Sequence, residues 1–269
     1  MKTKYHPLLH TAILLACACL PANAANILSD TFDTYNVGTA INTTTNWNAR
    51  SSANGGSVTV QGGDGFGTSN RYADFRDTSS ATTNGYSSMV HTTNIAAGQV
   101  VTFSLDFIAV NDQGINIGFA TSSNESQVLG STDRVFSASL TNGSIGGLNA
   151  TTGFGSGFFT LNTAYELSMV LNDSGATVNY ANRSLADNSY DVWIRDLTAS
   201  GSTYVGTGTF TSVAGGYYSA ARSFNGPTPN YLIDNWNVDE GALVSPIPEP
   251  RAALLGGLGL LALLRRRRA

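Results

Sequence analysis

Apolar and polar residues alternate along one long segment near the middle of the chain. Between Val100 and Val110, every odd-numbered position from 101 to 109 is apolar, and Thr102, Ser104 and Asp106 lie between them. A period of two places successive side chains on opposite faces of an extended chain. The segment is therefore predicted to be a strand with one face in a hydrophobic core.

Shorter segments of similar composition recur through the chain, separated by turn sequences such as Asn142-Gly143 and Ser200-Gly201. Asn and Gly favour tight turns because they tolerate a positive φ. No stretch between residues 25 and 243 shows the 3.6-residue apolar spacing of a helix. We predict one all-β domain, an antiparallel β-sandwich. Its expected strands are 27–37, 58–60, 100–110, 115–119, 134–140, 165–171, 177–180, 190–197, 204–210 and 231–238.

The first 24 residues have the pattern of a secretory signal peptide. Lys2 and Lys4 precede an apolar run at 8–20, and Ala22 and Ala24 are small residues at the positions that a signal peptidase reads. Cleavage is predicted after Ala24. The chain is then expected to be exported.

Both cysteines, Cys17 and Cys19, fall inside this signal. The segment Leu14-Leu-Ala-Cys17 offers an alternative, a lipoprotein signal, but that reading shortens the apolar run and leaves Ala22-Asn-Ala24 unused. The mature domain without cysteine can have no disulfide, thiolate metal site or cysteine nucleophile.

The last residues combine a rigid motif, an apolar segment and a cationic end. Pro248-Glu249-Pro250 is followed by an apolar run at 252–264 and then by four arginines. As a helix, 13 residues span about 20 Å, which is short against a bilayer core of about 30 Å. The arginines are expected to stay on the cytoplasmic side of the membrane.

This tail resembles the PEP-CTERM sorting signal of Gram-negative bacteria, and we assign it to residues 244–269. The resemblance implies processing by an exosortase near the Pro-Glu-Pro motif. It also implies a transient stay in the inner membrane, followed by transfer to the cell surface or extracellular matrix. The residues that carry it are Pro248, Glu249, Pro250, Arg265, Arg266, Arg267 and Arg268.

Without its two ends the domain is strongly acidic. Residues 25–245 keep 7 of the 14 basic residues and 17 of the 18 acidic ones, which leaves a net charge of −10 and no lysine. Such a charge argues against nucleic acid or an anionic membrane surface as a partner. It suits solubility outside the cell and the binding of divalent cations.

The two ends of the domain carry a second resemblance. Residues 29–38 together with Trp47, and residues 231–238, are similar to the opening and closing strands of concanavalin A-like, LamG-type jelly rolls. The resemblance implies a jelly roll whose first and last strands pair in one sheet. Proteins of this family bind glycans, mediate adhesion or sometimes cleave glycans, so the fold does not choose among these functions.

Catalytic residues are hard to find. Glycan hydrolysis needs two carboxylates at a fixed separation, and the Glu-x-Asp-x-x-Glu motif of jelly-roll glucanases is missing. Asp106 and Asp112 could pair, but a solvated strand face explains them as well. His91 is the one histidine of the mature domain, and no Gly-x-Ser-x-Gly motif accompanies it. We predict a non-catalytic protein, with a glycan-active hydrolase or lyase as the alternative.

A structural calcium ion is considered for the last strand. By alternation Leu232, Asp234, Trp236 and Val238 share one face, which would place a carboxylate among apolar groups. A buried charge needs N–H donors, an arginine or a cation. Calcium prefers carboxylate oxygens, and Asp33 on the first strand is the expected second ligand. Capping of loop N–H groups is the alternative, and no cofactor is required.

Exposed aromatic side chains could stack on sugar rings. Trp47, Trp193, Tyr217 and Tyr218 are the candidates because they lie near predicted turns or loops, although aromatic residues of a sandwich also fill its core. The sequence thus favours an exported surface or matrix protein, either a glycan-contacting module or a structural one, linked to exopolysaccharide or biofilm.

Overall fold

A computed structural model describes residues 25–50, 56–63, 65–67, 70–78, 86–126, 128–224 and 228–240. The predicted signal peptide with Ala22 and Ala24, and the predicted sorting signal, lie outside the described residues. In the described part, no helix has the length and apolar character needed to cross a membrane.

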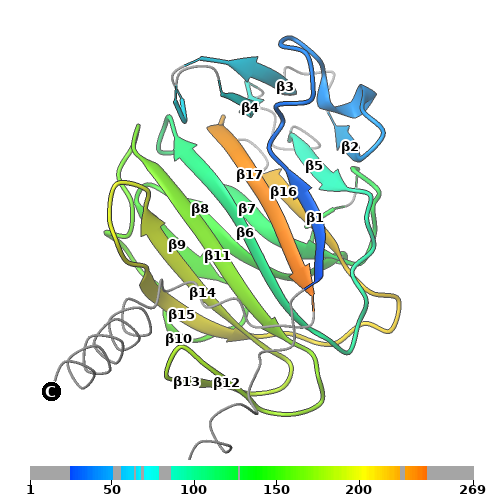
Figure 1. Ribbon diagram of the computed structural model, residues 1–269, viewed down its shortest axis with the longest axis vertical. Coiled ribbons are helices and arrows are strands. Elements are labelled where there is room, and N and C mark those ends of the chain that lie inside the picture. The colour runs from blue at the N-terminus through cyan, green and yellow to red at the C-terminus, as the bar shows by residue number, and fades with distance from the viewer. Residues whose placement is uncertain are drawn as a thin grey trace, which may run out of the picture.

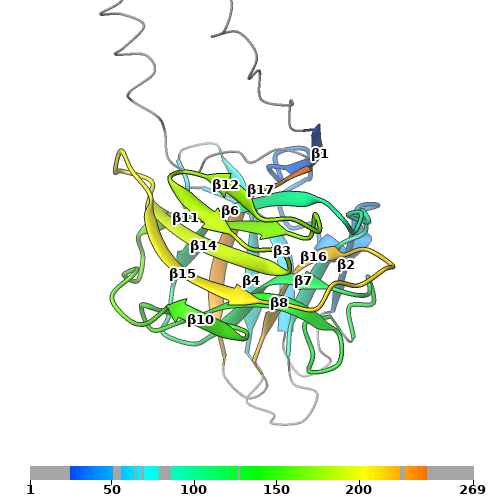
Figure 2. The same ribbon diagram turned by 90° about the horizontal axis from the view of Figure 1, so that it is seen from below.

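Two antiparallel sheets pack face to face and enclose the hydrophobic core (Figure 1). In the larger sheet the strand order is β10-β15-β14-β11-β6-β17-β4-β3, with β1 paired beside β17; in the smaller it is β2-β5-β16-β7-β8-β9. A separate hairpin, β12–β13, lies over the outer face of β11 and β14 (Figure 2). The predicted all-β antiparallel sandwich is confirmed.

The nine-stranded sheet contains β1 (Ala25–Asp30), β3 (Gly56–Gly62), β4 (Arg71–Asp77), β6 (Val100–Ala109), β10 (Ala150–Gly153), β11 (Ala164–Asn172), β14 (Ser189–Asp196), β15 (Thr203–Thr209) and β17 (Asn230–Glu240). The six-stranded sheet contains β2 (Trp47–Arg50), β5 (Ser88–His91), β7 (Ile115–Ala120), β8 (Arg134–Thr141), β9 (Ser144–Gly147) and β16 (Tyr218–Ser223). The hairpin is β12 (Val178–Tyr180) and β13 (Arg183–Leu185), and a short 3-10 helix, η1, covers Ile41–Thr43.

The long alternating segment is β6, and its odd-numbered side chains lie in the core as predicted. The first predicted strand, 27–37, is wrong in its length. It ends at Asp30, because Phe32 has a φ of 59° and the chain turns there. The sequence also gave no sign of β5 and β16, which are short and nearly buried on both faces, so they do not alternate. The outer face of these two strands is covered by Val128 and Leu129.

Aromatic rings fill the space between the sheets. Phe103 of β6 lies edge-on to Phe119 at 5.5 Å and to Trp236 at 5.0 Å between ring centroids, and Trp236 meets Trp47 at 5.2 Å. Edge-on contacts of this kind add to the free energy of apolar burial. They tie strands of the two sheets into one core.

A β-bulge divides β17 into two parts. Asp234 pairs with Asp106 and Asn237 pairs with Ser104, so β17 has two residues between these pairs where β6 has only one. Asn235, the first of the two, has a φ of 47°. Before the bulge Ile233 points into the core, whereas after it Trp236 does. An extra residue reverses the alternation of faces. The prediction that Asp234 shares a face with Trp236 is therefore wrong, and Asp234 lies on the outer face of the sheet.

The bulge also lets β17 pair with two strands on one side. Its first part, 230–233, pairs with β4, and its second part, 236–240, pairs with β1. β6 pairs along the other side of both parts. The pairing of the first and last strands, which the family resemblance implied, is confirmed.

Asp30 fixes the corner where β1 ends. Its Oδ1 accepts a hydrogen bond from the backbone N–H of Phe32 at 2.8 Å, and its Oδ2 accepts from the Tyr35 hydroxyl and the Trp47 indole N–H, both at 2.7 Å. Asp30, Phe32 and Trp47 are all buried, so water cannot replace the carboxylate as the acceptor for the two N–H groups. One carboxylate thus connects β1, the following turn and β2.

We expect Asp30→Ala to destabilise the domain strongly, because it leaves the N–H groups of Phe32 and Trp47 buried without an acceptor. Losing the acceptor of several buried donors costs about 2–5 kcal/mol. For a domain of this size that corresponds to a fall in Tm of roughly 5–15 °C. Thermal unfolding followed by circular dichroism measures it, with the exposed Asp112→Ala as control. Equal Tm values for the two variants would contradict the role assigned to Asp30.

Candidate functional site

Three of the four aromatic candidates are buried. Trp47 is 1% exposed in the core, Trp193 lies beneath the β12–β13 hairpin, and Tyr217 donates its hydroxyl to Asp173 at 2.6 Å. The expectation that these three rings are exposed near loops is wrong. Tyr218 is half-buried on the outer face of the six-stranded sheet, and its role in sugar stacking stays a prediction.

The hairpin packs over Trp193 and is anchored by an ion pair between the half-buried Arg183 and the buried Asp191. Asp191 accepts hydrogen bonds from Arg183 Nε at 2.8 Å and from the Tyr180 hydroxyl at 2.7 Å. The Arg183 guanidinium also stacks 3.5 Å above the centroid of the Tyr204 ring. Such cation–π contacts stabilise partly desolvated arginines. The protein's own hairpin therefore occupies the face of β14 where an exposed Trp193 could have met a sugar.

The predicted calcium ligands are held by protein groups. Asp234 is fully buried, and its two oxygens accept hydrogen bonds from the Asn235 backbone at 2.8 Å and from Asn70 Nδ2 at 2.6 Å. Asp33 is exposed and accepts from the Arg71 backbone N–H at 3.1 Å. Nowhere in the described part of the chain do three His, Cys, Asp or Glu side chains come together as metal ligands. The donors around Asp234 fit the alternative, capping of loop N–H groups.

Asp234 belongs to a row of charged residues on the outer face of the larger sheet. Asp234, Asp106, Glu166 and Arg195 are successive partners on β17, β6, β11 and β14. Asn235 donates to Asp106 at 2.7 Å, and Arg195 forms an ion pair with Glu166. Neighbouring strands lie about 4.8 Å apart, so each carboxylate interacts electrostatically with the next.

Burial raises the pKa of two carboxyls in this row. The pKa of Asp234 is raised to about 7, first by burial and further by the charges of Asp106 and Asp33, while its hydrogen bonds act in the opposite direction. Burial likewise raises the pKa of Asp106 to about 6, against the hydrogen bond from Asn235. Removing a carboxylate from water favours its neutral form.

Adjacent carboxylates with raised pKa values are a feature of glycan-cleaving sites. Here, however, Asp234 is 0% exposed and Asp106 is 8% exposed. A glycan cannot reach the two side chains in this arrangement. The row is best explained as a polar network whose two buried members, Asp106 and Asp234, fix the bulge of β17 against β6.

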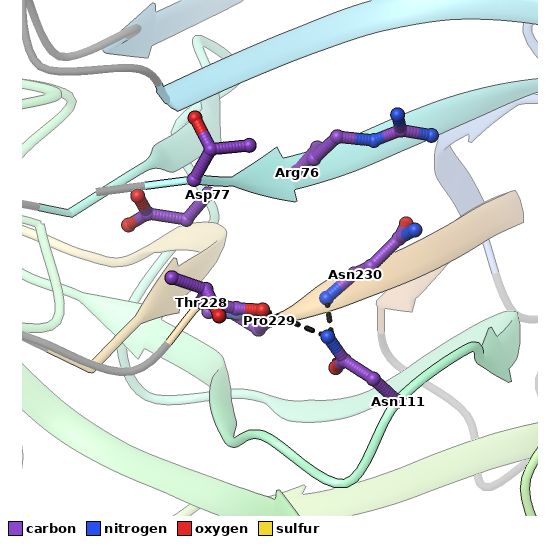
Figure 3. A pocket seen from close by; sticks show the side chains of 7 residues that line it. Arg76, Asp77, Asn111, Thr228, Pro229 and Asn230 are labelled. Atoms are coloured by element: carbon purple, nitrogen blue, oxygen red, sulfur yellow. Dashed lines mark hydrogen bonds between the residues drawn. The ribbon is translucent and has the colours of Figure 1, made fainter. Parts of the chain in front are cut away.

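A polar pocket of about 320 Å³ lies at one end of the same sheet, where β4 and β6 end and β17 begins (Figure 3). It is an open hollow at the rim of the sandwich. None of the described residues that line it is aromatic. Its lining residues are Arg76, Asp77, Thr78, Asn111, Thr228, Pro229 and Asn230.

Hydrogen bonds hold the floor of this rim pocket. Asn111 donates through Nδ2 to the Thr228 carbonyl at 2.8 Å and accepts from the Asn230 backbone N–H at 3.1 Å (Figure 3). The Asp77 backbone N–H donates to the Pro229 carbonyl at 2.9 Å. All three hydrogen bonds join segments far apart in the chain. The pocket is therefore preformed by the scaffold.

The sequence had shown only one part of this pocket, the turn that contains Asn111. Asn230 lies directly before the predicted strand 231–238, in which Asp234 was the candidate ligand. Arg76 lies in β4, which was not predicted. No local pattern indicates that positions more than 100 residues apart meet. Only the order β6-β17-β4 brings them together.

Solved lectin structures share this arrangement of strands. Lectin II from Ulex europaeus superposes with a TM-score of 0.51 and 12% identity, over 81% of this chain and 100% of the lectin. Peanut lectin gives a TM-score of 0.50 and 10% identity, over 83% and 100%. The fold is that of the legume lectins. The concanavalin A-like jelly roll expected from the sequence is thereby confirmed.

At these identities the likeness concerns the fold alone. No protein-family model matches the chain, and no curated protein matches it either.

The carboxylate row predicts how stability depends on pH. Because the pKa of Asp234 in the folded state lies above the value of about 3.9 for an unfolded aspartate, its contribution is favourable at low pH and is lost as the pH rises towards 7. Burial lowers the pKa of His91 to about 4, so its contribution has the opposite sign and is lost below about pH 6.5.

Comparing variants separates these two effects. We expect the free energy of unfolding of Asp234→Asn, relative to the unmodified protein, to increase between pH 4 and pH 7 by up to about 1.4 kcal/mol per pH unit. Urea unfolding at several pH values measures the difference. The exposed Asp112→Asn serves as the control, with an expected difference that stays flat. A flat difference for Asp234→Asn as well would contradict the assigned burial.

Proposed function

We propose that this protein is an exported, non-catalytic module that contacts glycans at the surface or in the extracellular matrix of a Gram-negative bacterium. The observation that carries the proposal is a preformed polar pocket on a lectin fold. Its amide, hydroxyl and guanidinium groups are of the kinds that hydrogen-bond sugar hydroxyls. The acidic, lysine-free composition supports a soluble domain that avoids nucleic acid.

The two ends of the chain supply the proposed route. The signal peptide directs export, and the tail from residue 244 holds the protein in the inner membrane until an exosortase processes it near Pro248-Glu249-Pro250. This part of the proposal is supported by the sequence pattern of the two ends. Release from the membrane then places the lectin-like domain next to exopolysaccharide.

A glycan-active hydrolase or lyase is the second candidate, and the row formed by Asp106, Glu166 and Asp234 is the observation in its favour. Its pKa pattern is suited to acid–base chemistry. The burial of Asp106 and Asp234 counts against it. We therefore favour binding without cleavage.

The mature protein should be retained on at least one polysaccharide, including the exopolysaccharide of the producing cell. Co-sedimentation with insoluble polysaccharides and affinity electrophoresis with soluble ones measure retention. Free polysaccharide of the same kind should compete, and heat-unfolded protein is the control. Lack of retention on every polysaccharide would reduce the protein to a structural component. Release of reducing ends or unsaturated sugars would instead favour the enzyme.

Processing of the tail is tested separately. Mass spectrometry of the surface-exposed protein should find a C-terminus before Ala252, near the Pro-Glu-Pro motif. Changing Glu249 to Ala should leave the protein in the inner-membrane fraction with its tail intact, because the motif is what the processing enzyme is proposed to read. The unmodified protein, found at the surface with residues up to Ala269 still attached, would contradict the proposed route.

A further inference from the structure

One buried acceptor in the rim pocket has no partner. The side-chain oxygen Oδ1 of Asn230 is buried, and no group in the described part of the chain donates a hydrogen bond to it. The backbone groups of Asn230 are both engaged, its N–H with Asn111 and its carbonyl with Val110 at 2.9 Å. Leaving a buried acceptor unsatisfied costs free energy. Asn230 is one of the residues that line the rim pocket, so a ligand bound there is the candidate source of the missing donor.

A donor stands beside this acceptor. Arg76 is the direct partner of Asn230 across the β4–β17 pair, and in Figure 3 the two side chains extend from their strands in the same direction. One guanidinium nitrogen of Arg76 lies 2.9 Å from Asp74 Oδ2, and this ion pair orients the guanidinium group. The Arg76 side chain is 49% exposed, so the other N–H groups of the guanidinium can reach a ligand.

The remaining polar groups of the pocket act as a rigid frame. The Asp77 side chain accepts from the Ser223 hydroxyl at 2.7 Å and from the Ser87 backbone at 3.0 Å, and it is turned away from Arg76 in Figure 3. Together with the bonds of Asn111, these contacts hold the strand ends in place before any ligand arrives. A preformed site loses less entropy on binding.

An acceptor and a donor side by side match a hydroxyl group, which donates one hydrogen bond and accepts others. The Asp74 carboxylate already neutralises Arg76, and the domain carries a net charge of −10, so an anionic ligand gains little. A volume of about 320 Å³ lies at the lower end of the range of about 300–1,000 Å³ for small-ligand pockets. The room suits one sugar ring.

We infer that the rim pocket binds a single neutral sugar residue of a glycan, with a ring hydroxyl that donates to Asn230 Oδ1 and accepts from the Arg76 guanidinium. The inference rests on the proposed function and adds the position and the chemical class of the ligand. Because the described lining of the pocket includes no aromatic ring, the affinity for a monosaccharide is expected to be weak.

The test is a titration of the mature protein with the methyl glycosides of glucose, galactose and mannose, followed by two-dimensional NMR, with glucuronic acid as the anionic probe. At least one neutral glycoside should bind with a Kd in the millimolar range, more tightly than glucuronic acid. Asn230→Ala should weaken binding about tenfold or more. Asn179→Ala, an exposed asparagine on the β12–β13 hairpin, is the matched control and should bind as the unmodified protein does.

Asn230→Asp separates recognition from a merely structural role. It keeps an acceptor oxygen at the same place, so binding should stay within about threefold of the unmodified protein, whereas Asn230→Ala loses it. Thermal unfolding confirms that both variants are folded. If Asn230→Asp binds as poorly as Asn230→Ala while both remain folded, the acceptor role is overturned.

The same variants distinguish the inference from the function on which it rests. A protein that is retained on a polysaccharide equally well with and without Asn230→Ala overturns the inference and leaves the proposed function standing. If glucuronic acid binds more tightly than every neutral glycoside, the inference that the ligand is a neutral sugar is overturned. A folded protein that binds no glycoside and no polysaccharide overturns both.

Discussion

The bulge at Asp234 and Asn235 is the constraint on which the nine-stranded sheet depends. Because of it, the last strand pairs with β4 through its first part and with β1 through its second, while β6 runs along both. The same extra residue turns Trp236 into the core and Asp234 to the outer face. The pairing of β17 with both β4 and β1, and the placement of Trp236 in the core, therefore follow from one local feature of the backbone.

Buried aspartates bind turns, loops and the β12–β13 hairpin to the sandwich at places where no strand pairing does so. Asp30 joins the first turn to Trp47, Asp173 binds Gly98 and Tyr217, and Asp191 anchors the β12–β13 hairpin. A carboxylate can accept several hydrogen bonds at once. In a domain without disulfides these residues connect loops to the core, so part of its acidity is structural.

The sequence predicted the fold well where one physical pattern dominates. In β6 every odd-numbered residue from 101 to 109 is apolar and these residues form the core face, so strand and core side chains were both correct. The pattern misplaced Asp234, because a bulge inverts alternation without leaving a clear mark in the sequence. Trp193 and Tyr217 were expected near turns, yet Trp193 lies in the middle of β14 beneath the hairpin and Tyr217 is buried with its hydroxyl bound to Asp173. The rim pocket joins strand ends that only the topology brings together, and no local pattern contains that information.

A crystal structure of the mature protein with an oligosaccharide from a polysaccharide that retains it would test the account most directly. We predict one neutral sugar ring in the rim pocket, with a hydroxyl in hydrogen-bond contact with Asn230 Oδ1 and the Arg76 guanidinium. An oligosaccharide bound elsewhere, for example beside Tyr218 on the opposite sheet, with the rim pocket empty, would contradict it.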